Sequence, residues 1–411
     1  MRVLILSQFF PPEVGATQSR IHAFAAGLAD RGHDVEVICE VPNHPQGVVH
    51  PEFRGRLAAQ RRLDGFRVVY VWVYAHPKKT FRTRLAFYGS YAAAATAAGA
   101  LRPRPDVVFA SSPPLPVAAA AALIASRHRV PWVMDVRDLW PEAAVAMGEL
   151  SNPTLLRMAE RLERQLYRSA SAITATTRPF RDAIAGSVER PEKVSLLPNG
   201  TSRLWIEGAR LEVDCSSLGL PADRFLWTYA GNVGRAQGLD AAVEAAGLLG
   251  DGFRLLILGD GPARAALERR ADDVPASAVE FRDQVPPAEA LRYLRASDAL
   301  LVPLAPDPVF EFFVPSKLFD FCAVGRPVIL AAAGEAHRLA SDARAALLVP
   351  PGDPAELASA VQRLKADRDL MSRLSDAGRR FGAEHRREHQ VDRLAEVLGE
   401  VVGSSATSSG D

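Results

Sequence analysis

The chain has 411 residues, more than a single hydrophobic core normally supports, so two domains are expected. Basic and acidic residues nearly balance, 49 against 48, which argues against a protein that binds nucleic acid through an overall positive charge. The three cysteines (Cys39, Cys215 and Cys322) lie far apart, without a CxxC pair or a Cys/His cluster. We therefore expect free thiols in a reducing cytosol, and neither disulfides nor a zinc site.

The first half of the chain alternates short apolar runs with amphipathic helices. Such alternation predicts a parallel sheet with helices on both faces, and sheets of this kind bind ligands at the carboxyl ends of their strands. Gly32 is suited to end the first helix. The expected helices are 19–31 and 154–169, and the expected strands are 3–6, 35–39, 66–73, 106–110, 130–136 and 172–176.

The alternation stops at 196–215, where turn residues without periodicity predict an interdomain linker. It then restarts, which predicts a second doubly wound domain. We expect α/β Rossmann-like domains at 1–196 and 197–387, and the amphipathic helix 388–402 is a candidate to pack back on the first. The small polar residues of 403–411 predict disorder. The later strands are expected at 226–230, 255–259, 279–281, 299–303, 327–331 and 346–349, with helices at 354–366 and 369–381.

The stretch YAGNVGRAQGLD (229–240) follows the first strand of the second domain. Gly231, Gly234 and Gly238 would let the backbone approach a ligand, a helix N-terminus favours an anion, and Arg235 adds positive charge. The pattern therefore fits a diphosphate cradle. Glycine spacing alone is weak, however, and fits a plain strand-to-helix turn with an exposed arginine even better.

The stretch LLILGDGP (255–262) predicts a buried strand that ends in a tight turn at the same edge of the sheet. We expect Asp260 mainly to cap the following helix. The turn at Gly259 is a second place where the backbone could face the ligand.

The apolar stretch VFEFFVPSKLFDF (309–321) contains one lysine, which is costly to bury without a partner. Pro315 and Ser316 predict a helix start capped by Ser316, with Lys317 in the first turn and Asp320 one turn later on the same face. A cation for phosphate beside a carboxylate for sugar hydroxyls suits a nucleoside diphosphate. An internal Lys317–Asp320 ion pair is an equally good interpretation in isolation, and the glycine-rich stretch favours the ligand.

The segments GNVGRAQGLD, LGDGPARAALE, VPSKLFDFCAVGRPVI and LPNGT resemble the family 4 glycosyltransferases of the GT-B fold. The segments ILSQFFPPEVGATQSRIHAFAAGLADRGHDVEVI and WVMDVRDLWPEAAVAMG resemble the fucosamine and acetamido-sugar transferases of bacterial polysaccharide biosynthesis. The resemblance extends from residue 1 to about 402. It implies two Rossmann-like domains facing across a cleft, and retaining transfer of a sugar from a nucleotide diphosphate sugar. It also implies no catalytic metal and no cofactor, and no DxD motif appears where a metal-dependent transferase would need one.

The family motifs map onto residues of the second domain. The ribose-binding acid falls on Asp320, whereas the other acid of the pair falls on Phe312, which cannot serve, with Glu311 adjacent. The family's loop Arg and Lys fall on Asn232 and Gln237, so Arg235 and Lys317 would supply those charges. The donor-binding residues implied are Gly15, Gly231, Asn232, Gly234, Arg235, Gln237, Gly259, Gln284, Val285, Ser316, Lys317 and Asp320, with Gln284 and Val285 in the loop that binds the base.

In the first domain, the loop PPEVGATQSR (11–20) and the segment DVRDLWPE (135–142) follow strands. By the resemblance, Asp138 is the best candidate to contact the acceptor hydroxyl, although an Arg137–Asp138 structural network is nearly as good an interpretation. His22, alone on a helix face, is expected to be packed or solvated. The acceptor-binding candidates are Glu13, Arg137, Asp138 and Glu142, and the catalytic candidates are Asp138, Arg235 and Lys317.

A basic cluster precedes an Ala-rich helix in the region 76–105. Basic and apolar residues together suit an anionic membrane surface and a polyprenyl-diphosphate acceptor, and an ordinary buried helix after a solvated basic turn is at least as good an interpretation. The sequence begins with a strand without a signal-peptide pattern, and no run is apolar enough to span a bilayer, so a cytoplasmic or peripheral location is expected. The residues concerned are Lys78, Lys79, Arg82 and Arg84, with Phe81, Leu85, Phe87 and Tyr88 as membrane contacts.

These patterns predict a glycosyltransferase that uses a nucleotide sugar, with UDP and an N-acetylated amino sugar as the family-based expectation. The acceptor would be a glycan, a lipid-linked glycan or a small molecule. Two alternatives remain. A nucleotide-sugar epimerase would need acid and base side chains around the sugar ring, and a weakened sugar-nucleotide-binding subunit would explain Phe312.

Overall fold

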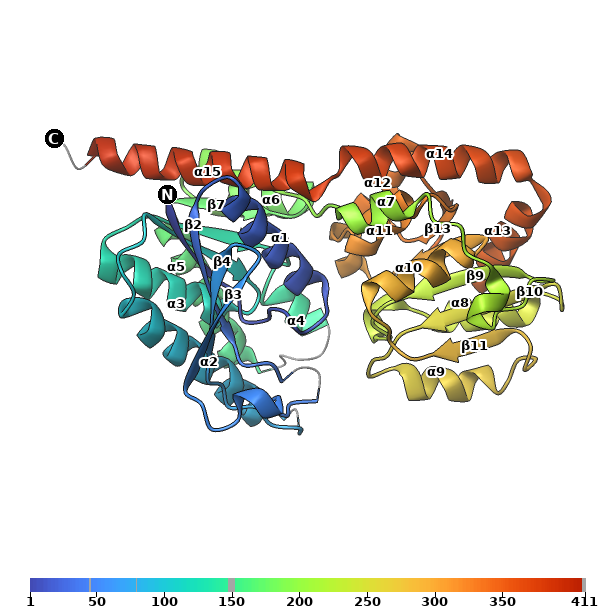
Figure 1. Cartoon of the computed structure of the whole chain (residues 1–411), viewed down its shortest axis with the longest axis horizontal. Helices are drawn as coiled ribbons and strands as arrows, with labels where there is room; N and C mark the ends of the chain where they lie inside the picture. Colours follow the sequence, from blue (N-terminus) through green and yellow to red (C-terminus); the bar gives the residue numbers. More distant parts are fainter. Residues whose placement is uncertain (44–45, 79, 147–151, 409–411) are drawn as a thin grey trace. The chain divides into compact units, whose positions relative to one another are not determined.

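The computed structural model of the chain describes residues 1–43, 46–78, 80–146 and 152–408 (Figure 1). It divides into two compact units, of which the first comprises Met1–Pro198 and Arg387–Asp411 and the second Asn199–Arg386. Cys39, Cys215 and Cys322 are free thiols.

The first unit is built on one sheet with the strand order β3-β4-β2-β1-β5-β6-β7-β8. Neighbouring strands pair in parallel, except that β3 is antiparallel to β4. Residues on both faces of β2, β5 and β6 are buried, as is typical of parallel sheets covered by helices on both sides. The strands are β1 (Arg2–Leu6), β2 (Asp34–Glu40), β3 (Ala58–Leu63), β4 (Phe66–Val71), β5 (Val107–Ser112), β6 (Trp132–Val136), β7 (Ala172–Ala175) and β8 (Val194–Leu196).

Strand β3 is absent from the sequence-based prediction. Most of its side chains are exposed, because it forms the edge of the sheet, so it lacks an apolar run. The turn to β4 is made by Asp64 and Gly65, both with positive φ. An Asp-Gly pair is a strong hairpin signal, and this dipeptide could have revealed the strand.

Helices cover both faces of the first sheet. They are α1 (Ala16–Asp30), α2 (Phe81–Ala100), α3 (Leu115–His128), α4 (Glu142–Ala146), α5 (Pro153–Ser169), α6 (Arg178–Ser187) and α15 (Arg387–Ser408). None of the described helices combines the length and apolarity needed to cross a bilayer.

Helix α15 packs against α1 of the first unit, although the two are far apart in the sequence (Figure 1). Val391 lies against Gly27, where a Cβ would approach it to 2.8 Å, and Leu394 and Leu398 are fully buried. The helix runs to Ser408, although composition predicts disorder from residue 403 onward, and 409–411 lie outside the described residues.

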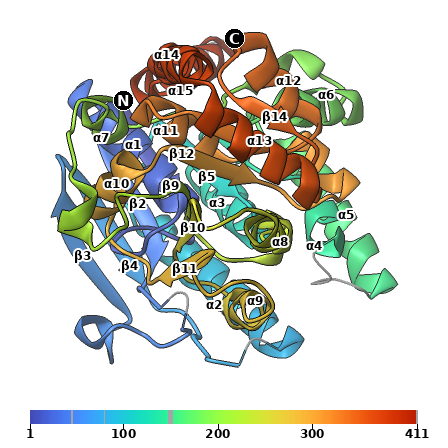
Figure 2. The same cartoon turned by 90° about the vertical axis from the view of Figure 1, so that its right-hand side faces the viewer.

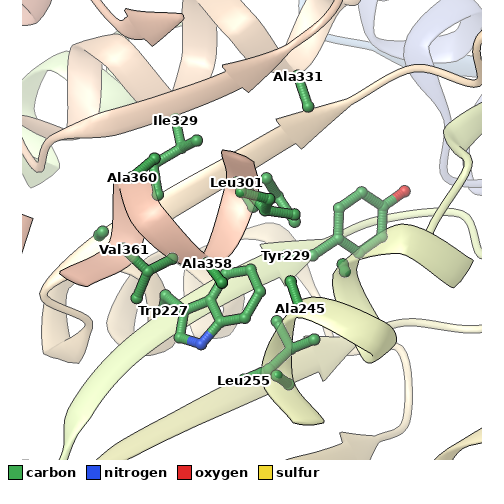
Figure 3. Packing of buried hydrophobic residues seen from close by; sticks show 14 of the residues in the cluster. Trp227, Tyr229, Ala245, Leu255, Leu301, Ile329, Ala331, Ala358, Ala360 and Val361 are labelled. Atoms are coloured by element: carbon green, nitrogen blue, oxygen red, sulfur yellow. The ribbon is translucent and has the colours of Figure 1, made fainter. Parts of the chain in front are cut away.

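The second unit has a parallel sheet with the strand order β11-β10-β9-β12-β13-β14. Its core contains the fully buried Trp227 and Tyr229 of β9, surrounded by aliphatic side chains of the sheet and of the helices that cover it (Figure 3). The strands are β9 (Phe225–Ala230), β10 (Phe253–Leu258), β11 (Val279–Arg282), β12 (Ala299–Pro303), β13 (Val328–Ala331) and β14 (Leu347–Val349).

In the second unit, α8 and α9 lie side by side (Figure 2). The expected linker contains a helix, α7, whose Trp205 packs on the core and whose Gly208 lies against Leu291. This part of the expected linker therefore belongs to the second unit. The helices are α7 (Arg203–Gly208), α8 (Asp240–Leu248), α9 (Arg264–Ala271), α10 (Pro287–Ala296), α11 (Ser316–Val324), α12 (Gly334–Ala343), α13 (Pro354–Ala366) and α14 (Arg368–Glu384).

Candidate functional site

The strand order of the second sheet reverses between β9 and β12. Ligands of open α/β sheets bind outside the carboxyl ends of the strands at such a point. Backbone bonds join the loops there: Gly231 N donates to Leu258 O (2.9 Å), Gly259 N to Arg282 O (3.0 Å) and Ala305 N to Ala236 O (2.9 Å). The segments that follow β9, β10, β11 and β12 therefore meet at one edge.

Two glycines allow the loops after β9 and β10 to touch. A Cβ on Gly259 would lie 1.9 Å from the carbonyl oxygen of Gly231, and both residues have positive φ (153° and 135°). Any side chain at Gly259 would force the loops apart. Gly259 thus has a structural reason to be glycine, whether or not it contacts a ligand.

Lys317 lies in the first turn of α11, and its amine reaches the end of β9. Its Nζ donates to the Tyr229 hydroxyl (2.7 Å) and lies 4.1 Å from the centre of the Tyr229 ring. A Cβ on Gly231 would lie 2.8 Å from Nζ, so the amine sits directly against the glycine-rich loop. Burial lowers the pKa of Lys317 to about 7, and the negative charge of Asp320 opposes the decrease.

Two capping expectations are wrong. Ser316 is the first residue of α11 and makes no capping hydrogen bond with its side chain, because Pro315 occupies the cap position. Asp260 does not cap α9, whose cap position is Ala263. Its carboxylate instead accepts a hydrogen bond from Gly261 N (2.7 Å) and stabilises the turn after β10.

Arg235 lies in a short 3-10 turn (Arg235–Gln237) within the glycine-rich loop. Its side chain is exposed, and nothing in the described part of the chain forms a hydrogen bond or ion pair with it. Gln237 Oε1 accepts from Gly234 N (3.1 Å), and the Asn232 side chain is exposed beside them. The loop therefore presents one uncompensated positive charge.

The loop after β11 is held by an arginine that sequence reasoning did not single out. Arg264 bonds Asp283 (2.7 Å) and the carbonyl oxygen of Gly259 (3.0 Å), which ties this loop to the one after β10. Gln284 is exposed, and Val285 packs against a cluster of apolar side chains that includes Leu226.

The segment before α11 forms the 3-10 turn η5 (Pro308–Phe312) beside a cavity of about 220 Å³. Phe310 and Phe313 pack together, whereas the Phe312 side chain is 47% exposed. Glu311 lines the cavity and Phe312 does not. The cavity is lined by Leu304, Ala305, Pro306, Asp307, Pro308, Phe310, Glu311, Ala333 and Pro351.

In the first unit, a buried ion pair holds α1 against β6. Arg20 donates to Asp135 through two nitrogens (2.9 and 3.2 Å), and Thr174 donates to the same carboxylate (2.8 Å). Asp135 is 0% exposed. Removing either partner would leave a buried charge without compensation, so the pair has a structural role.

Arg137 and Asp138 follow β6. Arg137 donates to the Ser111 hydroxyl (2.9 Å), to the Pro113 carbonyl (2.6 Å) and to the Thr17 hydroxyl, so its bonds run to other elements. No hydrogen bond or ion pair with another described residue holds the Asp138 carboxylate. Burial raises its pKa, and the charge of Arg137 opposes the rise.

The remaining first-unit candidates lie in different surroundings. Glu13 Oε1 accepts from Asn43 N (2.7 Å), and Gly15 precedes α1. Glu142 is exposed at the start of α4. Burial raises the pKa of Glu163 in α5, and the charge of Glu142 adds to this rise. His22 contacts Asp64 of the β3–β4 turn (2.8 Å).

Models of two glycosyltransferase domains match the chain. A glycosyl transferase 4-like domain matches residues 15–200 and a glycosyl transferases group 1 domain matches 224–367. The putative colanic acid biosynthesis glycosyl transferase WcaI of Escherichia coli K12 is 25% identical over 347 residues, which are 81% of this chain and 83% of that one. This chain is a glycosyltransferase.

Two solved structures have the same fold as this glycosyltransferase. Sucrose-phosphate synthase from Thermosynechococcus elongatus has a TM-score of 0.74 at 18% identity, with 98% of this chain and 99% of that one covered. Anabaena Alr3699/HepE in complex with UDP-glucose has a TM-score of 0.72 at 18% identity, with 97% and 100% covered. The fold is GT-B, as the sequence predicts.

In each unit of this glycosyltransferase, sequence reasoning missed residues that lie near candidate functional residues. Tyr229 contacts Lys317, yet in the sequence it is one apolar residue of a buried strand. Buried Glu40 accepts from the side chains of Gln8 (2.8 Å) and Asn43 (2.7 Å), beside Glu13. Glu40, which ends β2 directly after the buried residues 37–39, was the available signal for that cluster.

Proposed function

We propose that this glycosyltransferase transfers a sugar from a UDP-sugar with retention of configuration and without a metal ion. An N-acetylated amino sugar is the proposed donor sugar, and the acceptor is a glycan, a polyprenyl-diphosphate-linked glycan or a small molecule. The observation that carries the proposal is the amine of Lys317, held at the carboxyl end of β9 against Gly231.

The surroundings of Lys317 suit a diphosphate. The N-terminus of α11, the lysine and the exposed Arg235 all favour an anion, and one charge-assisted bond to phosphate would offset the desolvation of the amine. Asp320, one turn along α11, is the proposed contact for the ribose. HepE, solved with UDP-glucose, supports the choice of UDP.

The proposed reaction uses these charges. The bond between the anomeric carbon and the diphosphate oxygen breaks, and the acceptor oxygen bonds the same face of that carbon. The hydroxyl proton passes to an oxygen of the leaving diphosphate. Lys317 and Arg235 stabilise the negative charge that grows on this group, and Asp138 of the first unit is proposed to bind the acceptor hydroxyl.

The acceptor is proposed to belong to bacterial cell-surface polysaccharide synthesis, which the colanic acid relative supports. The start of α2 fits a peripheral contact with an anionic membrane, because Phe81 and Leu85 are 49% and 61% exposed beside exposed Lys78 and Arg82. Phe87 and Tyr88 are half-buried, which makes them weaker candidates, and Lys79 lies outside the described residues.

A thermal-shift panel with UDP, GDP, ADP and TDP, with and without EDTA, tests the donor site. We expect UDP to give the largest shift, unaffected by EDTA, and the shift to be lost in Lys317→Ala and Asp320→Ala. No shift with any nucleotide would remove the basis of the proposal. NMR of the product with a UDP-sugar then assigns the anomer, and hydrolysis or transfer of any donor excludes a mere binding subunit.

A further inference from the structure

Tyr229 has its ring in the core of the second unit and its hydroxyl at the candidate site. The side chain is fully buried near the end of β9, among residues such as Leu301 and Ala331. In Figure 3 its oxygen points away from the labelled core residues. A ring packed in this way has little freedom to move, so its oxygen occupies a fixed place.

The hydroxyl makes two hydrogen bonds, one as the donor and one as the acceptor. It donates to the backbone carbonyl of Asn232 (2.5 Å) and accepts from Lys317 Nζ (2.7 Å). Burial raises the pKa of Tyr229, so the phenol keeps its proton. The hydroxyl therefore remains the donor to Asn232 and the acceptor from Lys317. One atom thus connects the glycine-rich loop, through Asn232, with the first turn of α11.

We propose that Tyr229 is a positioning residue that fixes the Lys317 ammonium and the loop backbone in one arrangement, ready for the diphosphate of the donor. The inference rests on the proposed function of Lys317. Without the hydroxyl, the amine loses an acceptor and Asn232 loses a donor, so the cation and the loop would no longer be held together.

The same bond affects the protonation of the lysine. Within the described part of the chain, two titratable groups face the amine, Asp320 on its own helix and Tyr229 on β9. The charge of Arg235 lies in the exposed part of the loop. A hydroxyl oxygen that accepts from Nζ favours the ammonium form. Its loss therefore moves the titration of Lys317 to lower pH.

The test is calorimetric titration of UDP into the full chain between about pH 6 and 9, in the wild type and in Tyr229→Phe. We expect the variant to bind UDP about tenfold more weakly at pH 7. In the wild type, affinity should fall by up to about tenfold per pH unit above the lysine pKa, and in the variant this decline should begin at lower pH. Ionisation of UDP itself is common to both proteins and cancels in the comparison.

Tyr91→Phe is the matched control. Tyr91 is also fully buried, and its hydroxyl donates to the Ile38 carbonyl in the first unit (2.9 Å), so the variant loses a buried hydrogen bond away from Lys317. It should keep the wild-type pH profile for UDP. Lys317→Met should abolish the lysine-dependent decline altogether.

The outcomes separate the two proposals. If the wild type does not bind UDP, the proposed function fails and the role of Tyr229 with it. If the wild type binds UDP with the expected pH dependence and Tyr229→Phe has the same affinity and profile, only the positioning role is overturned.

Discussion

Lys317 lies in surroundings that favour a neutral amine, and this lowers the free energy of unfolding of the nucleotide-free protein. Burial lowers its pKa to about 7, so at neutral pH the folded state discourages a charge that the unfolded chain carries freely. Lys317→Met removes this conflict and keeps a side chain of similar length. We expect the variant to melt a few degrees higher than the wild type without nucleotide at pH 7, and to lose the shift caused by UDP.

Lys365→Met is the control for that experiment. Lys365 is an exposed lysine of the same unit, and it also lies over an aromatic ring, that of Phe253 (4.3 Å). It should retain the UDP shift without a gain in melting temperature. An unchanged UDP shift in Lys317→Met would show that the amine does not contact the diphosphate.

Glu163 makes the free energy of unfolding of the first unit depend on pH. Its carboxylate accepts from the Tyr167 hydroxyl (2.7 Å), and burial raises its pKa from 4.5 to about 7. Between these values the folded state holds a proton that the unfolded chain has released. The free energy of unfolding therefore falls as pH rises through this interval, by roughly 3 kcal/mol in total.

Glu163→Gln should flatten that dependence, so the variant should gain stability relative to the wild type between pH 5 and about 8. Urea unfolding at both pH values measures the effect. Glu396→Gln, at an exposed position of the same unit, should leave the dependence intact. A parallel pH dependence in wild type and Glu163→Gln would contradict the assignment.

At the scale of the elements, the sequence predicts strands best where both faces are buried. Val107–Ser112 and Ala299–Pro303 read as apolar runs because no side of them meets water. Strand β3 was not predicted because it is an exposed edge strand. Helix α7 was not predicted because six residues are too few to show a clear helical period.

The candidate site was predictable where a charged residue lies in an apolar stretch that is expected to be buried. Lys317 stands out among phenylalanines, and the structure places its amine at the carboxyl edge of the sheet. Tyr229 does not stand out, because a tyrosine within a strand looks like any core residue until its hydroxyl partner is known. The prediction that Ser316 and Asp260 cap helices is wrong because Pro315 and Ala263 occupy the cap positions.

The turn η5 yields a prediction about its two neighbouring residues. Glu311 lines the cavity before α11, whereas Phe312, at the position of the family's first acid, does not line it. If a donor hydroxyl binds in the cavity, Glu311→Gln should lower kcat/KM for the donor about tenfold and leave UDP affinity unchanged. Phe312→Ala should change neither value by more than about twofold, because its side chain is 47% exposed. A larger loss in Phe312→Ala than in Glu311→Gln would reverse the assignment.

The whole molecule consists of two units with separate cores, and the proposed nucleotide site lies in the second. Calorimetry should therefore show two melting transitions, of which UDP raises one. A ligand at 100 times its Kd adds about 2.7 kcal/mol to the unit that binds it, which corresponds to roughly 5–10 °C for a unit of this size.

Matched core substitutions assign the transitions. Leu394 of α15 and Leu364 of α13 are both fully buried, in the first and second unit respectively. Each Leu→Ala change should destabilise its own unit by about 2–5 kcal/mol. Leu364→Ala should lower the transition that UDP raises, and Leu394→Ala the other, even though α15 follows the second unit in the chain. A single transition moved by both substitutions and by UDP would mean that the two cores unfold as one.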